Sequence, residues 1–264
     1  MRKLYIVKIG SNIIDDKAEL QQFLQTFANL SSPKILIHGG GKLSSELSLQ
    51  LGIVPMMVDG RRITDEQSLD VVVMTYAGLI NKKVVAALQG FGCNAIGLCG
   101  ADGNIIPAKK RAVKDIDYGF VGDIEISRIK SDRISALLNA GFTPIIAPIT
   151  HDENGQLLNT NADTIASSIA ASMAKNYDVE LLYCFEKAGV LKDVNNDNSV
   201  VDEITPAQYE ELKHEGIISK GMIPKLENAF SALRMGVRSV YIAHAKMTSR
   251  IINNQEFTGT RLHD

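Results

Sequence analysis

Short apolar runs rich in β-forming residues alternate along this chain with longer segments whose apolar residues have helical spacing. The first two such runs are residues 3–9 and 34–38, and apolar residues from Leu20 to Phe27 lie between them at helical spacing. Strands that alternate with helices form a mainly parallel sheet with helices on both faces. The pattern therefore predicts an α/β fold whose ligands bind beyond the carboxyl ends of the strands.

The same two signatures continue to the end of the chain. A long helix is expected from Thr64, with Gln67 completing a capping box, to about Gly90. No linker, repeat or low-complexity tract interrupts the pattern, so one domain of residues 1–264 is expected. Further strands are predicted over residues 94–98, 104–108, 121–126, 143–149, 179–184 and 239–242, and further helices over 43–51, 131–139, 162–174, 206–214 and 224–235.

Charge and cysteine content exclude several classes of protein. The 28 Lys and Arg residues against 30 Asp and Glu give a net charge of −2, whereas a nucleic-acid-binding protein usually has a basic excess. The three cysteines and five histidines have no metal-ligand spacing, so we expect no disulfide scaffold and no protein-bound metal. We find no signal-peptide core and no window of membrane-spanning length, which predicts a cytoplasmic protein without a membrane partner.

Three successive glycines follow the second strand, in the segment HGGGK at residues 38–42, and a helical pattern begins directly after them. A backbone without side chains approaches a ligand closely, and the free N–H groups at a helix start favour an anion. The segment matches neither the P-loop, because Leu36 replaces its first glycine, nor the dinucleotide motif, because Ser44 replaces its third. It indicates either an anion-binding loop of another kind or a flexible turn.

Two lysines lie where an ammonium group needs a partner. Lys8 is in an otherwise apolar strand, and its burial is costly unless its charge reaches a partner or a pocket. Lys225 follows Pro224 at the start of a predicted helix, where a cation opposes the helix dipole. Each is a candidate for binding a small anion, and the alternative for each is a side chain that extends to solvent.

Amides and a carboxylate cluster at residues 159–163, directly before an apolar helical segment. One side chain of the cluster is expected to cap that helix, with Asp163 in its first turn. Capping does not account for the whole cluster, which also suits ligand binding or the orientation of a lysine. Arg61 and Arg62, ahead of the long helix, form a pair that either grips a carboxylate or faces water.

Taken in order, these motifs resemble those of the amino acid kinase family, and the chain is most similar to its acetylglutamate kinases. The resemblance covers nearly the whole chain. It implies a three-layer αβα sandwich with a mainly parallel central sheet, an N-terminal lobe (about 1–175) that binds the acylated amino acid, and a nucleotide-binding C-terminal lobe (about 176–264). It depends on Lys-x-Gly at 8–10, His-Gly-Gly-Gly at 38–41, Gly-x-Arg at 60–62, Asn-x-Asn-Ala-Asp at 159–163 and Gly-Met-x-x-Lys at 221–225.

The resemblance implies a reaction, in which ATP phosphorylates the side-chain carboxylate of N-acetyl-L-glutamate in arginine biosynthesis, with Mg²⁺ carried by the nucleotide. Lys8 and Lys225 would neutralise the transferring phosphoryl group, and Asp163 would hold both lysines. Gly10 and Gly41 would donate backbone N–H groups to the same oxygens. The residues implied to bind the acylated substrate are Gly40, Gly41, Arg62 and Asn159, and those implied to bind the nucleotide are Lys8, Glu186, Lys187, Ala188, Gly189, Val190, Leu191, Ile217, Ile218, Ser219 and Lys225.

The sequence departs from the family pattern at two places. Ser11 replaces a second glycine after the first strand, and Phe185-Glu186-Lys187 replaces a Ser/Thr-Asp-Val segment of the nucleotide loop. A non-catalytic ligand sensor on the same fold, or a kinase of the same fold with another acceptor, is therefore an alternative. N-succinyl-L-glutamate is an alternative substrate, whose second carboxylate would require another cation, such as Lys42 or Arg61.

The family resemblance also implies a homodimer. The chain begins close to its first strand, and an extension before that strand accompanies arginine-inhibited hexamers in this family. Feedback inhibition is therefore not expected.

Overall fold

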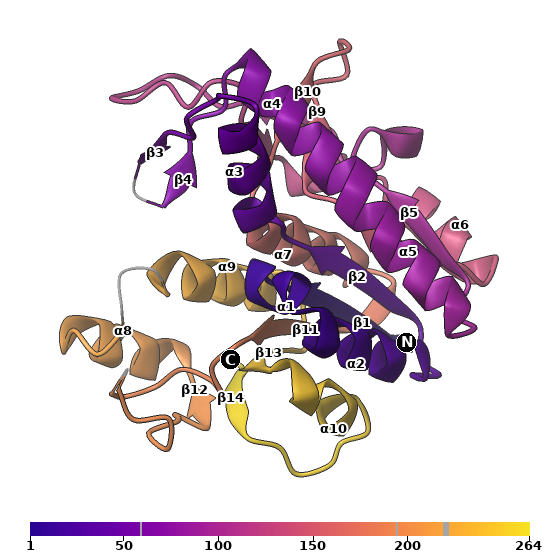
Figure 1. Cartoon of the computed structure of the whole chain (residues 1–264). Helices are drawn as coiled ribbons and strands as arrows, with labels where there is room; N and C mark the ends of the chain where they lie inside the picture. The colour runs from indigo at the N-terminus through magenta and orange to yellow at the C-terminus, as the bar shows by residue number, and fades with distance from the viewer. Residues whose placement is uncertain (59, 194, 219–221) are drawn as a thin grey trace.

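The computed structural model describes residues 1–58, 60–193, 195–218 and 222–264, and its centre is an eight-stranded sheet (Figure 1). The strand order is β12-β14-β13-β11-β1-β2-β8-β5, and β13 with β14 is the antiparallel pair in the described sheet. The mainly parallel α/β fold is thus confirmed. The strands are β1 (Arg2–Ile9), β2 (Lys34–His38), β5 (Ala95–Leu98), β8 (Thr143–Ile146), β11 (Tyr177–Phe185), β12 (Glu203–Ile204), β13 (Ser239–His244) and β14 (Gly259–Leu262).

Helices cover both faces of this sheet and produce the predicted three layers (Figure 1). One face packs against α6 (Ser131–Asn139), α7 (Ala162–Met173), α8 (Pro206–His214) and α9 (Ile223–Arg234). The other packs against α1 (Ser11–Asp15), α2 (Lys17–Ala28), α3 (Gly41–Gln50), α4 (Glu66–Val73), the π-helical segment η1 (Met74–Ile80), α5 (Asn81–Gly90) and α10 (Thr248–Ile252).

Short elements lie outside the central sheet and the main helices. They are the strand pairs β3 (Met57–Val58) with β4 (Arg61–Arg62), β6 (Ala108–Lys110) with β7 (Gly122–Ile124), and β9 (Ile149–His151) with β10 (Leu157–Asn159), and the 3-10 turns η2 (Asp102–Asn104), η3 (Ile126–Arg128) and η4 (Ala245–Met247).

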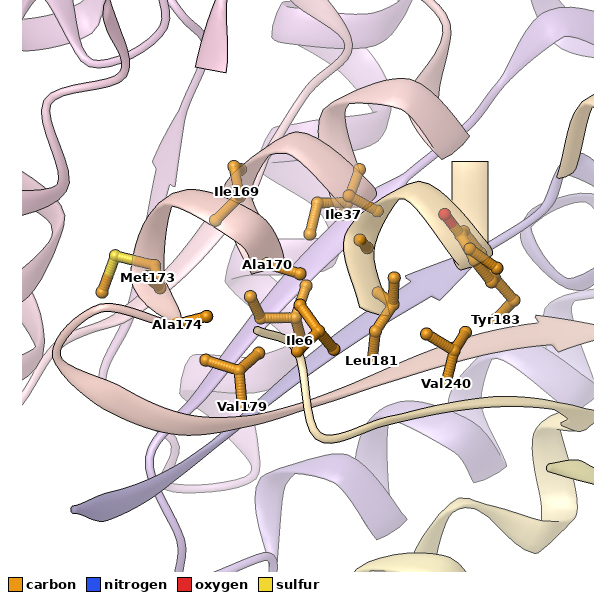
Figure 2. Packing of buried hydrophobic residues seen from close by; sticks show 14 of the residues in the cluster. Ile6, Ile37, Ile169, Ala170, Met173, Ala174, Val179, Leu181, Tyr183 and Val240 are labelled. Carbon is orange, nitrogen blue, oxygen red and sulfur yellow. The ribbon is translucent and has the colours of Figure 1, made fainter. Parts of the chain in front are cut away.

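The alternation of side chains along the central strand β1 decides where its lysine lies. Leu4 and Ile6 belong to the core under α7, whereas Tyr5 and Val7 belong to the core on the opposite face. Because successive side chains of a strand point to opposite faces, Lys8 lies on the same face as Leu4 and Ile6. Figure 2 shows this core, with Ile6 between strand neighbours and the apolar face of α7. The lysine is thus directed toward the helix that carries Asp163.

The start of the long helix differs from the prediction. Asp65, rather than Thr64, is the N-cap of α4, and its carboxylate accepts the backbone N–H of Ser68 at 2.8 Å. Thr64 is extended instead: its N–H donates to the carbonyl of Tyr118 and its hydroxyl accepts from the side chain of Asn159. These remote contacts hold Thr64 outside the helix, so the proposed capping box with Gln67 was wrong.

Two predicted strands were also wrong. Residues 104–108 form no continuous strand: Gly103 and Asn104 have positive φ, and the chain turns through η2 before β6 begins at Ala108. The run 143–149 is divided, because β8 ends at Ile146 and β9 begins at Ile149 in a different sheet. Pro148 lies at the division and has no N–H to donate to a continuing ladder.

The continuous helical stretch Glu66–Gly90 is long and apolar enough to cross a membrane by length and composition, contrary to the sequence expectation. Its buried face includes Val72, Tyr76, Ile80, Val84 and Leu88, which belong to the core beneath the central sheet. A core helix of a water-exposed domain passes the same test, so this stretch is weak support for a membrane span.

Candidate active site

Lys8 and Asp163 form a buried ion pair at the carboxyl end of β1. The ammonium Nζ lies 2.6 Å from Asp163 Oδ1, and both side chains are about 10% exposed. Asp163 is placed by the first turn of α7, whose N-cap Asn161 accepts the backbone N–H groups of Asp163 and Thr164. The hydroxyl of Tyr183 donates to the carbonyl of Asp163 at 3.1 Å. The cluster at residues 159–163 thus both caps the helix and orients a lysine.

The glycine loop lies beside this pair, between β2 and α3. Gly40 has a φ of 153°, a conformation that L side chains rarely adopt, so this position favours glycine; a Cβ there would also crowd the end of the Ile80 side chain and the ring of Tyr76. The N–H of Gly41 donates to Ser11 Oγ at 3.2 Å. The hydroxyl of Ser11 therefore occupies a position where an oxygen of an anionic ligand would accept the same N–H.

His38 holds the loop from beneath and is fully buried. Its Nδ1 lies 2.8 Å from the carbonyl oxygen of Gly39, and its Nε2 lies 3.2 Å from the side-chain nitrogen of Asn81. The same Asn81 nitrogen also donates to the carbonyl oxygen of Ile145. Nδ1–H therefore donates and Nε2 accepts, which defines a neutral imidazole. Burial lowers the pKa of His38 to about 4. The residue is a structural support of the loop rather than a base.

Arg62 is directed into the same region from β4 and is 9% exposed. Its Nη2 donates to the carbonyl of Gly41 at 3.1 Å and to Ser45 Oγ at 2.7 Å. Its Nη1 is buried without a hydrogen-bond partner. A buried guanidinium with a free donor suits a carboxylate ligand, which accepts two parallel N–H bonds.

Two cavities meet at this site. One, of about 620 Å³, is lined by the glycine loop, Arg62, Asn159 and Asp163. The other, of about 420 Å³, is lined by Gly10 and by the segment after β11. Lys8, Ser11 and Lys225 line both cavities. Two ligands bound side by side would therefore face each other across two ammonium groups.

The predicted nucleotide-binding residues lie around the smaller cavity, with two exceptions. Ala188 is not part of the described lining, and Ser219 lies outside the described residues. Lys187 is exposed and pairs with Asp197 at 2.8 Å, while the carboxylate of Glu186 accepts from Asn12. The predicted residues that do line this cavity are Lys8, Glu186, Lys187, Gly189, Val190, Leu191, Ile217, Ile218 and Lys225.

Lys225, at the start of α9, differs from Lys8 in its partners. It forms no ion pair within 4.0 Å with any residue that the structure describes. Burial lowers the pKa of Lys225; the carboxylate of Asp163 raises it in part, and the charge of Lys8 lowers it again. Asp163 therefore contacts one of the two lysines and acts on the other through space.

Sequence reasoning missed three contributors to the site. Tyr76 comes from the π-helical segment and packs on Gly40, Arg111 lines the larger cavity from the loop after β6, and the ring of Phe185 lies beneath both lysines. Tyr76 and Arg111 belong to no local motif, whereas Phe185 begins the segment that replaces the family's Ser/Thr-Asp-Val in the nucleotide loop, and nothing in that motif predicted a ring contact with the lysines. A wide helical turn such as η1 often marks a functional site, but nothing in the local sequence indicated it.

An arrangement of this kind suits phosphoryl transfer, which requires in-line positioning and positive charge rather than covalent help from the protein. Comparison with known proteins agrees with phosphoryl transfer: the chain belongs to the amino acid kinase family, whose sequence profile matches residues 3–244.

Among full-length relatives, the acetylglutamate kinase of Cytophaga hutchinsonii is 52% identical over 263 residues, which is 99% of each chain. The acetylglutamate kinase of Bacteroides thetaiotaomicron is 49% identical over 260 residues, 98% of each. Among solved structures, N-acetylglutamate synthase from Neisseria gonorrhoeae, complexed with coenzyme A and N-acetyl-glutamate, superimposes with a TM-score of 0.84 at 21% identity. The match covers all of this chain but 60% of the synthase, and at this identity it concerns the fold.

Proposed function

We propose that the protein transfers the γ-phosphoryl group of MgATP to the side-chain carboxylate of N-acetyl-L-glutamate, a step of arginine biosynthesis. The observation that carries the proposal is the junction of two cavities at Lys8, Ser11 and Lys225. ATP binds in the cavity beside Gly189 and the acylated amino acid in the cavity beside Arg62. The lobe of residues 1–175 would thus hold the acceptor and the lobe of residues 176–264 the donor.

The reaction follows from this placement. A carboxylate oxygen of the acceptor attacks the γ-phosphorus in line, a new P–O bond forms, and the bond to the β,γ-bridging oxygen breaks. ADP leaves with the electron pair, and the product is an acyl phosphate. Lys8 and Lys225 face the equatorial oxygens from both cavities and stabilise their charge, while the N–H groups of Gly10 and Gly41 donate to the same region. Ser11 must release the N–H of Gly41 for this to occur.

Substrate orientation depends on Arg62 and Asn159. The α-carboxylate of the acceptor pairs with the guanidinium of Arg62, whose Nη1 has no other partner. Mg²⁺ arrives with the nucleotide and is held by phosphate oxygens and water. The described residues contain no group of three or more His, Cys, Asp or Glu side chains placed to hold a metal ion.

N-succinyl-L-glutamate is a second candidate acceptor. The larger cavity is lined not only by Arg62 but also by Lys42, Arg61 and Arg111. These cations offer partners for a second carboxylate, although Arg111 already pairs with Asp123 at 2.6 Å. A single assay separates the two acceptors, because the succinyl compound gains affinity only if one of these cations reaches its extra carboxylate.

The test is an assay of ADP release with each acceptor, with the acyl phosphate trapped by hydroxylamine. Lys8→Arg is the matched variant: it keeps the charge, but its planar fork does not reproduce a point ammonium. We expect turnover to fall about 100-fold or more, as when one preorganised donor is removed. Inactivity of the wild-type protein on both acceptors, with tight ATP binding, would instead favour a non-catalytic sensor.

We also propose that the protein is a cytoplasmic homodimer, with the apolar face around α3 and β3 as its interface. Leu49, Leu51, Val54, Met56 and Met57 are each more than half exposed on this face. Large apolar side chains left exposed so close together in the chain are typical of a protein contact. Sedimentation analysis of Leu49→Glu should show a monomer where the wild type sediments as a dimer; a monomeric wild type would refute the proposal.

A further inference from the structure

Phe185 ends the strand β11 and lines the smaller cavity, next to the two lysines that line both cavities. Its ring centroid lies 4.0 Å from Nζ of Lys225 and 5.6 Å from Nζ of Lys8. The ring also stacks on Tyr183, with centroids 6.3 Å apart and planes inclined by 27°. β11 is flanked by β1 and β13, and Phe185 itself pairs with His244 of β13, so the ring is carried by an inner strand of the sheet.

The two lysines are not equally supported. Lys8 has the carboxylate of Asp163 at 2.6 Å, whereas the described residues offer Lys225 no carboxylate within 4.0 Å. Burial, the largest effect, and the charge of Lys8 lower the pKa of Lys225, and the carboxylates of Asp163 and Glu186 offset this only in part from beyond contact distance. The negative face of an aromatic ring attracts an ammonium within about 6 Å of its centroid, and most strongly where water is excluded. The ring of Phe185 lies within this distance of both ammonium groups, and it is closer to Lys225, which has no carboxylate in contact among the described residues.

We propose that Phe185 is a positioning residue for phosphoryl transfer, whose ring face holds the ammonium group of Lys225, and less strongly that of Lys8, at the junction of the two cavities. The inference rests on the proposed function. Before ATP binds, the ring replaces the negative charge that the γ-phosphate later supplies. Lys225 is therefore charged and directed at the transfer point when the nucleotide arrives, without a carboxylate of the described residues in direct contact with its ammonium group.

A space-filling role for Phe185 makes a different prediction. A ring that only packs against Tyr183 would be replaceable by another apolar group of similar volume, and its electron density would not matter. A ring that attracts ammonium groups loses that attraction as fluorine withdraws electrons from its face, at nearly constant volume.

The experiment therefore replaces Phe185 by mono-, di- and trifluorophenylalanine in the full-length protein and measures kcat and the KM for ATP and acceptor. We expect kcat to fall stepwise with fluorine content, while thermal unfolding midpoints stay constant. Phe185→Leu should lower kcat roughly 2- to 30-fold, the range of a cation–π contact between exposed and desolvated sites, and Phe185→Tyr should restore it. The matched control is the same series at Phe257, which packs edge-on against Tyr241 at 5.6 Å.

A second measurement needs no turnover. The Lys225 ammonium is titrated by NMR, with its signal assigned through Lys225→Arg, and its pKa should be lower in Phe185→Leu than in the wild type. The alkaline limb of the kcat profile should move to lower pH by the same amount. A fluorine series without a trend at Phe185, or an unchanged Lys225 titration in Phe185→Leu, would overturn the inference. Inactivity of the wild type on both acceptors would refute the proposed function, and the titration would still decide the role of Phe185.

Discussion

Replacement of Asp163 by Asn removes a charge but almost no volume, so it isolates the buried ion pair with Lys8. The two charges are 2.6 Å apart, which corresponds to an attraction of about 6 kcal/mol at an effective dielectric constant of about 20. Desolvation of both groups offsets part of this attraction. Removing one partner of a buried pair typically costs about 3–5 kcal/mol, because the other charge is left uncompensated. We expect a loss of this size for Asp163→Asn, and a further decrease in the pKa of Lys225, which Asp163 now raises.

The assay is urea unfolding at neutral pH, carried out on a double-mutant cycle with Lys8→Met. The double variant should be more stable than Asp163→Asn alone, because no lone charge remains buried. The exposed pair of Lys109 and Glu125 provides the control, and Glu125→Gln should leave stability nearly unchanged. If the costs of the two single replacements at the site simply add within about 0.5 kcal/mol, the pair does not interact in solution and the reasoning fails.

Three further outcomes are expected. The pKa of His38 is about 4 in the folded protein and about 6.5 in the unfolded chain, so the free energy of unfolding should decrease by about 3 kcal/mol as the pH falls from 6.5 to 4. Below pH 4 this residue should cause no further loss. The pH dependence should be absent from the unfolding of His38→Asn, and an equal dependence in that variant would contradict the assignment. Arg62→Lys should raise the KM of the acylated acceptor about 10- to 100-fold with a smaller change in the KM of ATP, since one fork of charged hydrogen bonds is lost; equal effects on both would refute its role. Gly40→Ala should lower both stability and turnover, because its Cβ meets Ile80 at a positive φ, and calorimetry with wild-type-like unfolding would exclude that clash.

Local patterns predicted most of the sheet. The strands β2 and β11 and the helices α6 and α8 lie where the spacing of apolar residues placed them, because each buries a face defined by its own sequence. One of the errors occurred where a remote contact prevailed. Thr64 looked like a helix cap, but its hydrogen bonds to Tyr118 and Asn159 hold it extended.

The candidate site divides in the same way. The glycine loop, Lys8 and Asp163 belong to motifs that a reader of the sequence can find. Arg111 does not, since it reaches its cavity from a segment without a motif of its own. Phe185 stands at a motif position where the family has Ser or Thr, so the motif did not predict an aromatic contact with the lysines.

The sequence by itself determined the class of fold, the family and the residues that could meet an anion, because periodicity, glycine runs and capping residues act over a few neighbours. The tertiary structure decided which of those residues share a site. Lys8, Asp163, Phe185 and Lys225 span more than 200 positions of the chain. They meet because the parallel strands β1 and β11 end at one edge of the sheet and the helices α7 and α9 begin beside it. The charge state and the orientation of each lysine side chain depend on neighbouring groups that are brought close only in the folded protein.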